Sequence, residues 1–202
     1  MTFTSKFIVT VSLLALVACS PSSSGEAELS GNWTLSPLES SMSYVTIKNG
    51  NVGEVNTFSD ISGVVTSGGE AEFNIALDSV QTYNETRDPR MKKYVFETDK
   101  FAQATVSADI NMTQFNVLGI GNSKSLSVPL SFDLHGITEQ KDVDLLVTRL
   151  GANKVRIANK GAILIDAEDF GFEAGLAKLQ ELAKLNSISP VVSATVSLTF
   201  ER

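Results

Sequence analysis

The chain has few of the cysteine and histidine residues that bind metals or take part in nucleophilic catalysis. Its 202 residues include one cysteine, Cys19, and one histidine, His135. A single cysteine excludes an intrachain disulfide, and one histidine without cysteine partners argues against a structural zinc site. The sequence also lacks the Gly-x-Ser-x-Gly and Ser-x-x-Lys motifs of nucleophilic hydrolases. We therefore expect no metal, no cofactor and no enzyme activity.

Positive charge is scarce as well. The formal net charge is −7 at pH 7, which argues against nucleic acid as a partner and against a general basic surface for anionic lipid. At the N-terminus, Phe7–Ala18 is an apolar run of twelve residues broken only by Thr10 and Ser12. This run is too short to span a bilayer comfortably and is typical of a signal-peptide core.

The apolar run ends in Leu16-Val17-Ala18-Cys19, which resembles the bacterial lipobox. The resemblance implies a signal peptide over residues 1–18, a diacylglycerol on the Cys19 thiol and an acylated new amine. Multiple acyl chains would anchor the protein stably to a membrane. Ser20, where an Asp would favour the inner membrane, implies the outer membrane, with the protein facing the periplasm. An ordinary secretory signal with an incidental cysteine, or an uncleaved anchor, are the alternatives.

A tether is expected after the cysteine, over residues 19–30. Ser, Pro, Gly, Glu and Ala dominate this segment, so it buries too little apolar surface to order itself. The remaining residues, 31–202, suit one domain with one core.

Short segments of alternating polarity dominate this domain and predict strands with one buried face and one solvent-exposed face. The clearest is Leu126–Leu134, where Pro129 should mark an edge, bulge or corner because it cannot donate to a ladder. Turn residues separate the segments. The other predicted strands are Met42–Ile47, Val52–Phe58, Gly63–Thr66, Glu72–Leu77, Ala104–Ile110, Gln114–Gly119, Val143–Leu150, Val155–Ile165 and Ala194–Glu201.

One segment breaks this pattern. Phe172–Asn186 places Leu176, Leu179 and Leu182 at helical spacing. We interpret it as a short helical lid on a sandwich or barrel, in preference to a membrane-surface helix, because its polar face is not distinctly basic.

Four motifs follow one another along the domain. They are Trp33-Thr34-Leu35-Ser36-Pro37, Asp78-Ser79-Val80 through Arg87-Asp88 to Phe96, Leu130-x-Phe132-x-Leu134-His135-Gly136, and Asp169-Phe170-Gly171-Phe172. In this order they resemble the YceI-like family, the lipocalin-like envelope proteins that hold polyisoprenoid lipids. The resemblance spans Trp33 to Phe200, and two family histidines are replaced, by Glu39 and Asn49. The stretch after Asp78 is the strongest match: a strand-like run that ends in a polar loop before aromatics return the chain to the core.

The resemblance implies an all-β, lipocalin-like antiparallel barrel of about eight strands, a size that is filled by side chains or holds one slim ligand. It also implies that the aromatic side chains line a cavity for a long isoprenoid chain. Individually, each is as well explained as an ordinary core residue. The implied lining residues are Tyr44, Phe73, Tyr94, Phe96, Phe101, Phe132, Phe170 and Phe172.

Charged residues near Asp78–Phe101 could meet a lipid headgroup at the barrel mouth. Arg87, Asp88 and Arg90 lie in one loop, and Arg suits bidentate contact with a pyrophosphate. The alternative is a solvated loop whose Arg87–Asp88 pair fixes the turn. His135 could join this mouth, or close the turn at Gly136 by a hydrogen bond.

The sequence thus predicts a lipoprotein that binds a polyisoprenoid or similar long amphiphile in the periplasm, for carriage, storage or sequestration. The alternative is a non-catalytic module for protein interaction with a filled barrel. Whether the protein forms a homodimer stays open.

Overall fold

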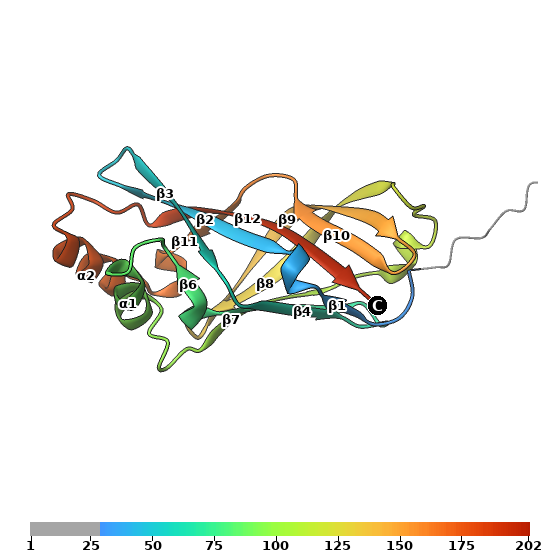
Figure 1. Cartoon of the computed structure of the whole chain (residues 1–202), viewed down its shortest axis with the longest axis horizontal. Helices are drawn as coiled ribbons and strands as arrows, with labels where there is room; N and C mark the ends of the chain where they lie inside the picture. The colour runs from blue at the N-terminus through green and yellow to red at the C-terminus, as the bar shows by residue number, and fades with distance from the viewer. Residues whose placement is uncertain (1–28) are drawn as a thin grey trace, which may run out of the picture.

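Alternating apolar and polar residues form the strands of a long antiparallel sheet (Figure 1). The computed structural model describes residues 29–202. The strands are β1 (Trp33–Leu35), β2 (Ser41–Lys48), β3 (Val52–Phe58), β4 (Ile61–Val65), β5 (Glu70–Ala76), β6 (Val80–Gln81), β7 (Gln103–Asp109), β8 (Ser123–Leu134), β9 (Ile137–Gly151), β10 (Lys154–Asn159), β11 (Ile163–Asp166) and β12 (Val191–Glu201).

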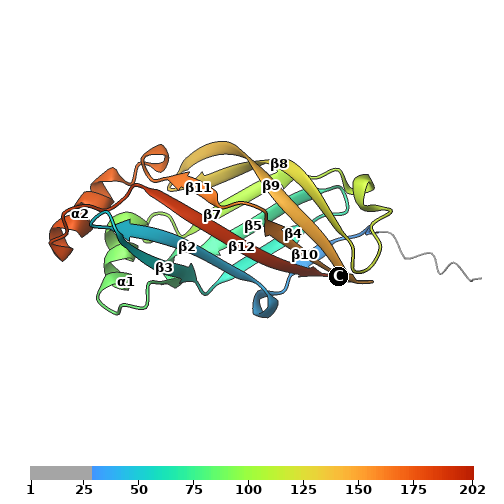
Figure 2. The same cartoon turned by 90° about the horizontal axis from the view of Figure 1, so that it is seen from above.

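The sheet closes on itself. The hydrogen-bonded order β1-β4-β5-β7-β8-β9-β10-β12 returns to β1, because β12 also pairs with β1. This circuit is a closed barrel of eight antiparallel strands, as the sequence predicts. Strands β2, β3, β6 and β11 extend its wall toward one end, so the barrel is elongated (Figures 1 and 2).

A one-turn 3₁₀ helix, Pro37–Glu39, separates β1 from β2 and is bound to β12. The backbone N–H of Ser36 donates to the carbonyl of Thr199 at 2.8 Å. The hydroxyl of Thr199 donates to the carbonyl of Glu39, and its N–H donates to the Ser40 hydroxyl, both at 2.9 Å. Thr199 is fully buried and satisfied, so β1 and β2 stay on one edge of β12 despite the break.

Both α-helices lie at the same end of the barrel (Figure 2). They are α1 (Arg87–Arg90), which continues into a π-helical turn, η3 (Met91–Val95), and α2 (Glu173–Ala183). The amphipathic pattern of Phe172–Asn186 predicts α2 correctly. None of the helices described over residues 29–202 has both the length and the hydrophobicity of a transmembrane helix.

The prediction of a polar loop after Asp78 is wrong in part, because α1 and η3 occupy its centre. The side-chain oxygen of Asn84 accepts hydrogen bonds from the N–H groups of Thr86 and Arg87, both at 3.0 Å. These bonds satisfy backbone donors that a helix start leaves free. The residues that read as turn formers therefore start a helix.

The strand predicted over Gln114–Gly119 is also wrong. The chain there forms a 3₁₀ helix, Met112–Phe115, followed by a loop. The side chain of Asn111 caps this helix by accepting from the N–H of Thr113 at 3.1 Å. Phe115 and Leu118 are buried and close the end of the barrel opposite α1 and α2. Their apolar character serves a cap, which sequence alternation does not distinguish from a strand.

A glycine sets how closely α2 packs. Gly175 is buried inside α2, and a β-carbon there would stand 2.2 Å from the carbonyl oxygen of Tyr94 in η3. Glycine in a helix interior costs about 1 kcal/mol relative to alanine. The close approach of α2 to η3 explains its presence.

Gly175→Ala should therefore lower stability by about 1–3 kcal/mol, because the overpacking exceeds the gain in helix propensity. At this chain length that is a fall in Tm of roughly 2–10 °C, measurable by thermal unfolding. The matched control is Gly161→Ala, since a β-carbon at Gly161 meets nothing within 4 Å. Equal Tm values for the two variants would contradict the packing role of Gly175.

Candidate functional site

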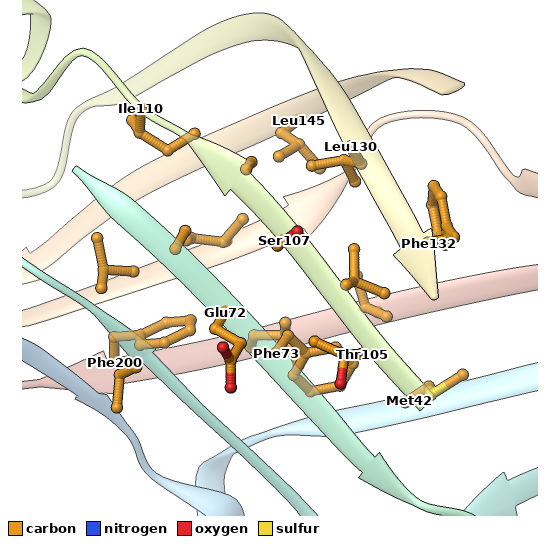
Figure 3. A pocket seen from close by; sticks show the side chains of 18 of the residues that line it. Met42, Glu72, Phe73, Thr105, Ser107, Ile110, Leu130, Phe132, Leu145 and Phe200 are labelled. Atoms are coloured by element: carbon orange, nitrogen blue, oxygen red, sulfur yellow. The ribbon is translucent and has the colours of Figure 1, made fainter. Parts of the chain in front are cut away.

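An apolar cavity of about 230 Å³ lies inside the barrel (Figure 3). Its walls come from the inward residues of almost every strand of the circuit, including Phe73 on β5, Phe132 on β8 and Phe200 on β12. Several of these residues are only half-buried although they point inward, since they face the cavity. An engineered apolar cavity of ~150 Å³ holds benzene, so this one has room for a slim hydrocarbon segment.

The implied lining residues divide into two groups. Phe73, Phe132 and Phe170 line the cavity. The other five do not, and lie toward the α1–α2 end of the barrel or on η3. Tyr94, for example, is half-buried, with the ammonium of Lys93 5.1 Å from its ring centroid. The five positions are Tyr44, Tyr94, Phe96, Phe101 and Phe172.

Four of these five belong to a continuous row of rings. Tyr44 stacks on Phe58 at 5.6 Å between centroids, Phe58 meets Phe96 at 5.6 Å, and Phe96 meets Phe172 edge-on at 5.9 Å. The row continues through His135 to Phe101 at 4.8 and 4.3 Å. Such pairs are favourable geometries for aromatic contact. The row fills the α1–α2 end of the barrel.

The wall also contains small and aliphatic residues that sequence reasoning did not select. Ala71, Val106, Leu130, Leu145 and Val196 all line the cavity. Their signal was present in the sequence, since Leu130 shares the inward parity of Phe132 and Val196 that of Phe200. An aromatic criterion alone misses them.

The predicted mouth residue Arg87 forms part of a polar cluster outside the cavity. Its guanidinium pairs with the carboxylate of Glu54 and donates to the carbonyl of Thr82 at 2.6 Å. Lys48 also pairs with Glu54, at 2.7 Å. Burial alone would raise the pKa of Glu54, but the hydrogen bonds and charges of Lys48 and Arg87 outweigh it and hold that pKa below its usual value.

The neighbouring charges are bonded within the protein as well. A carboxylate oxygen of Asp88 accepts from the N–H of Thr82 at 2.8 Å and from its hydroxyl. Arg90 donates to the carbonyl of Leu182 in α2, at the 3.5 Å limit. Neither residue lines the cavity, and nor does Arg87 or His135. Contact between these four residues and a headgroup stays a prediction.

Unpartnered polar atoms accompany this cluster. Among residues 29–202, the Tyr44 hydroxyl, Oδ1 of Asn56 and Nε of Arg87 are buried without a hydrogen-bond partner. Tyr44 and Asn56 are opposite each other in the β2–β3 ladder. Burial raises the pKa of Tyr44, and Asp88 adds to this while Arg87 opposes it, so the hydroxyl stays protonated. This part of the barrel keeps unused donors and an unused acceptor.

His135 connects three parts of the α1–α2 end. It has a positive φ of 57° in the β8–β9 turn. Its Nδ1 lies 3.1 Å from the carbonyl oxygen of Phe170, and its Nε2 lies 3.0 Å from the carboxylate of Glu97. Because both neighbours are acceptors, only the doubly protonated ring donates to both. Hydrogen bonds from Lys100 and His135 hold the pKa of Glu97 below its usual value.

The opposite end holds a buried cation. Arg149 points inward from β9 and is 1% exposed. Its guanidinium donates to the carbonyl of Leu118 at 3.0 Å and to that of Gly151 at 3.2 Å. Trp33 and Leu29 are also buried, and both line the cavity. Leu29 thus packs in the core although the sequence assigns it to the tether.

Chemistry-bearing groups do not converge on the cavity. Within residues 29–202, no group of three or more His, Cys, Asp or Glu side chains is placed to hold a metal ion. The cavity wall is apolar, and burial of apolar surface against such a wall is worth about 25 cal/mol per Å².

Glu97→Gln should lower stability near neutral pH and have little effect in acid. A carboxylate with a lowered folded pKa contributes stability above its unfolded value of about 4.3, and the contribution is lost as pH falls through the folded value. Thermal unfolding between pH 6 and pH 3 measures this, and the Tm gap to the unmodified protein should shrink toward pH 3. Asp99→Asn, an exposed neighbour, is the control. A gap that is constant over this range would refute the assignment.

Known structures share this barrel. A polyisoprenoid binding domain from Saccharophagus degradans, implicated in plant cell wall breakdown, is 34% identical, with a TM-score of 0.82 over 84% of this chain and 97% of that one. Burkholderia cenocepacia BcnA is 18% identical, with a TM-score of 0.63 over 82% of this chain and 98% of that one. Campylobacter jejuni YceI protein is 16% identical, with a TM-score of 0.54 over 73% and 84%.

At 18% and 16% identity, the last two similarities show the fold alone. Among curated proteins, none matches the chain. The family model of the YceI-like domain matches residues 33–201. That range extends from the first strand of the circuit to the end of β12. The chain therefore belongs to the YceI-like domain family.

Proposed function

We propose that the protein binds a polyisoprenoid or a similar long-chain amphiphilic lipid inside its barrel. The observation that supports this most directly is the apolar cavity enclosed by the strand circuit. The related domain from Saccharophagus degradans is described as polyisoprenoid binding, and the protein acts as a container rather than an enzyme.

The cavity volume is small for a long lipid chain. Ligand pockets of drug-like molecules usually measure about 300–1,000 Å³, and this cavity measures about 230 Å³. A long chain therefore needs the wall to give way. Met42 and Met112 line the cavity, and methionine adapts its shape readily. Small residues such as Ala104 and Ala194 leave room beside them.

The interaction module with a filled barrel is less well supported. The three most exposed large apolar side chains lie on separate elements: Leu38 follows β1, Tyr83 precedes α1 and Val117 lies in the loop after Phe115. Ile47 and Val55 lie near each other on the β2–β3 hairpin, which makes a small apolar area only. Single exposed hydrophobic residues are normal on soluble proteins, whereas a docking face is a contiguous patch.

Val196→Phe should abolish lipid binding, because the added ring occupies the cavity. Val196 is half-buried on β12 and lines the cavity. Native mass spectrometry of the protein from bacteria, made with Cys19→Ser and without detergent, should show a discrete added mass that fragments as a prenyl chain. We expect at least a tenfold lower bound fraction in Val196→Phe.

The adjacent outward residue provides the control for this substitution. Thr195 is exposed on the same strand, so Thr195→Phe adds the same ring outside the barrel and should keep the bound mass. Absence of a prenyl mass from the unmodified sequence, persisting after incubation with geranylgeraniol, would refute lipid binding and favour the interaction module.

The N-terminal residues extend the proposal to location. We propose a signal peptide over residues 1–18, lipidation of Cys19, a tether over residues 19–30 and an outer-membrane lipoprotein facing the periplasm. These residues precede the described ones almost entirely. The support is the apolar run that ends in Ala18-Cys19.

Cys19→Ser should release the protein from the membrane fraction or leave an uncleaved precursor, because the thiol is the attachment point for the diacylglycerol. Fractionation and intact-mass measurement of the full chain distinguish these outcomes. Ser20→Ala, which leaves the thiol in place, is the control and should stay in the membrane fraction. Unchanged partitioning of Cys19→Ser at the mature mass would reject acylation.

A further inference from the structure

We propose that the lipid chain enters sideways, through a seam in the barrel wall between β7 and β8. This inference rests on the proposed function, since it names the route by which a bound lipid reaches the cavity. The seam is defined here as the stretch where Ala108 and Asp109 of β7 stand beside Pro129 and Leu130 of β8.

Neither end of the barrel offers a comparable route. At the α1–α2 end, Phe96, Phe170 and Phe172 are 7%, 0% and 5% exposed. At the opposite end, Trp33 and Phe115 are 2% and 4% exposed. Buried aromatic side chains therefore fill both ends, and opening either one would expose large apolar groups to water.

The ladder between β7 and β8 is incomplete. It contains three registered pairs and ends at Ser107↔Ser131, although β7 continues to Asp109 and β8 begins at Ser123. On its other edge, β8 pairs with β9 along its whole length. Pro129 lies two residues beyond the last pair and cannot donate a ladder hydrogen bond. Part of this edge of β8 is therefore left without a ladder partner on β7.

A groove on the outside of the barrel covers this seam. Ser107, Asp109, Pro129 and Ser131 line it. Ala71 and Ala108, which are opposite each other in the β5–β7 ladder, line both this outer groove and the inner cavity.

Val64, Glu72 and Ser107 also line both the groove and the cavity, so beside the seam only the strand layer itself separates outside from inside. Figure 3 shows the same part of the wall, with Ser107 of β7, Glu72 of β5 and Leu130 of β8 beside the cavity. The unpaired stretch of β7 and β8 is where a slim isoprenoid chain would pass through this layer.

The acidic rim of the groove disfavours a ligand with a negatively charged headgroup. Glu70, Glu72 and Asp109 contribute three carboxylates to it. A pyrophosphate would be repelled there, whereas an uncharged prenol would not. The ligand that suits this route is a prenyl chain with a neutral head, which enters by its apolar end.

The test closes the seam reversibly and measures loading. Asp109→Cys and Pro129→Cys are made in the full chain with Cys19→Ser, and the two thiols are joined by a reducible bis-methanethiosulfonate linker. Trp33, the single tryptophan, lines the cavity and reports geranylgeraniol by its fluorescence in stopped flow. We expect the linker to slow loading at least tenfold and reductant to restore the rate.

The matched control links Ser127→Cys to Asp144→Cys, an exposed registered pair on the fully paired β8–β9 edge. This link should leave the loading rate unchanged.

The outcomes separate the route from the proposed function. Equal loading rates in linked and reduced protein, with the same final amount bound, overturn the seam and leave lipid binding intact. A failure of every form, including the unmodified sequence, to bind geranylgeraniol at equilibrium overturns the proposed function and the seam with it.

Discussion

The fold depends on one long strand. β12 pairs with β10 and β11 along one edge and with β1 and β2 along the other, so the circuit closes where its first strand, β1, pairs with β12. Every inward position elsewhere points into a closed interior only because this edge-to-edge closure holds. Thr199, fully buried on β12, stabilises this closure. Its backbone N–H and its hydroxyl form hydrogen bonds to the turn between β1 and β2, which lies on the outside of the wall. Loss of closure would leave open edges, which are prone to aggregation.

Closure explains why a cavity remains. Eight strands fix a diameter at which side chains just fill the interior, so space is left wherever several inward residues are small. Ala71, Ala104, Ala108 and Ala194 provide that space in the middle of the barrel. Toward the α1–α2 end, Tyr44 and its row of rings take it up again. Along the barrel axis, aromatic rings therefore fill the α1–α2 end, an apolar cavity lies in the middle, and Phe115 and Leu118 close the opposite end.

The sequence predicted the parts of this structure that local periodicity controls. The alternation of Leu126–Leu134 and the helical spacing in Phe172–Asn186 correspond to β8 and α2. Periodicity gives the inward face of a strand but not the height of a residue along the barrel, so Phe132 on the cavity and Tyr44 in the aromatic row had the same signal. Partners distant in the chain were equally hidden: Arg87 pairs with Glu54, 33 residues earlier, and His135 with Glu97. The helix after Asp78 depended on a side-chain cap that resembles a turn.

The incomplete β7–β8 ladder is a gap that an otherwise closed barrel tolerates at little cost in free energy. A backbone group left unpaired in an apolar interior costs about 1–3 kcal/mol, whereas one that faces water costs far less. At the seam, Ser107, Asp109 and Ser131 make the outer surface polar and solvated, and Pro129 has no N–H to leave unpaired. A gap of equal size at either aromatic end would expose rings instead. The position of the break in the wall therefore follows from the same balance of hydration and burial that keeps the two ends shut.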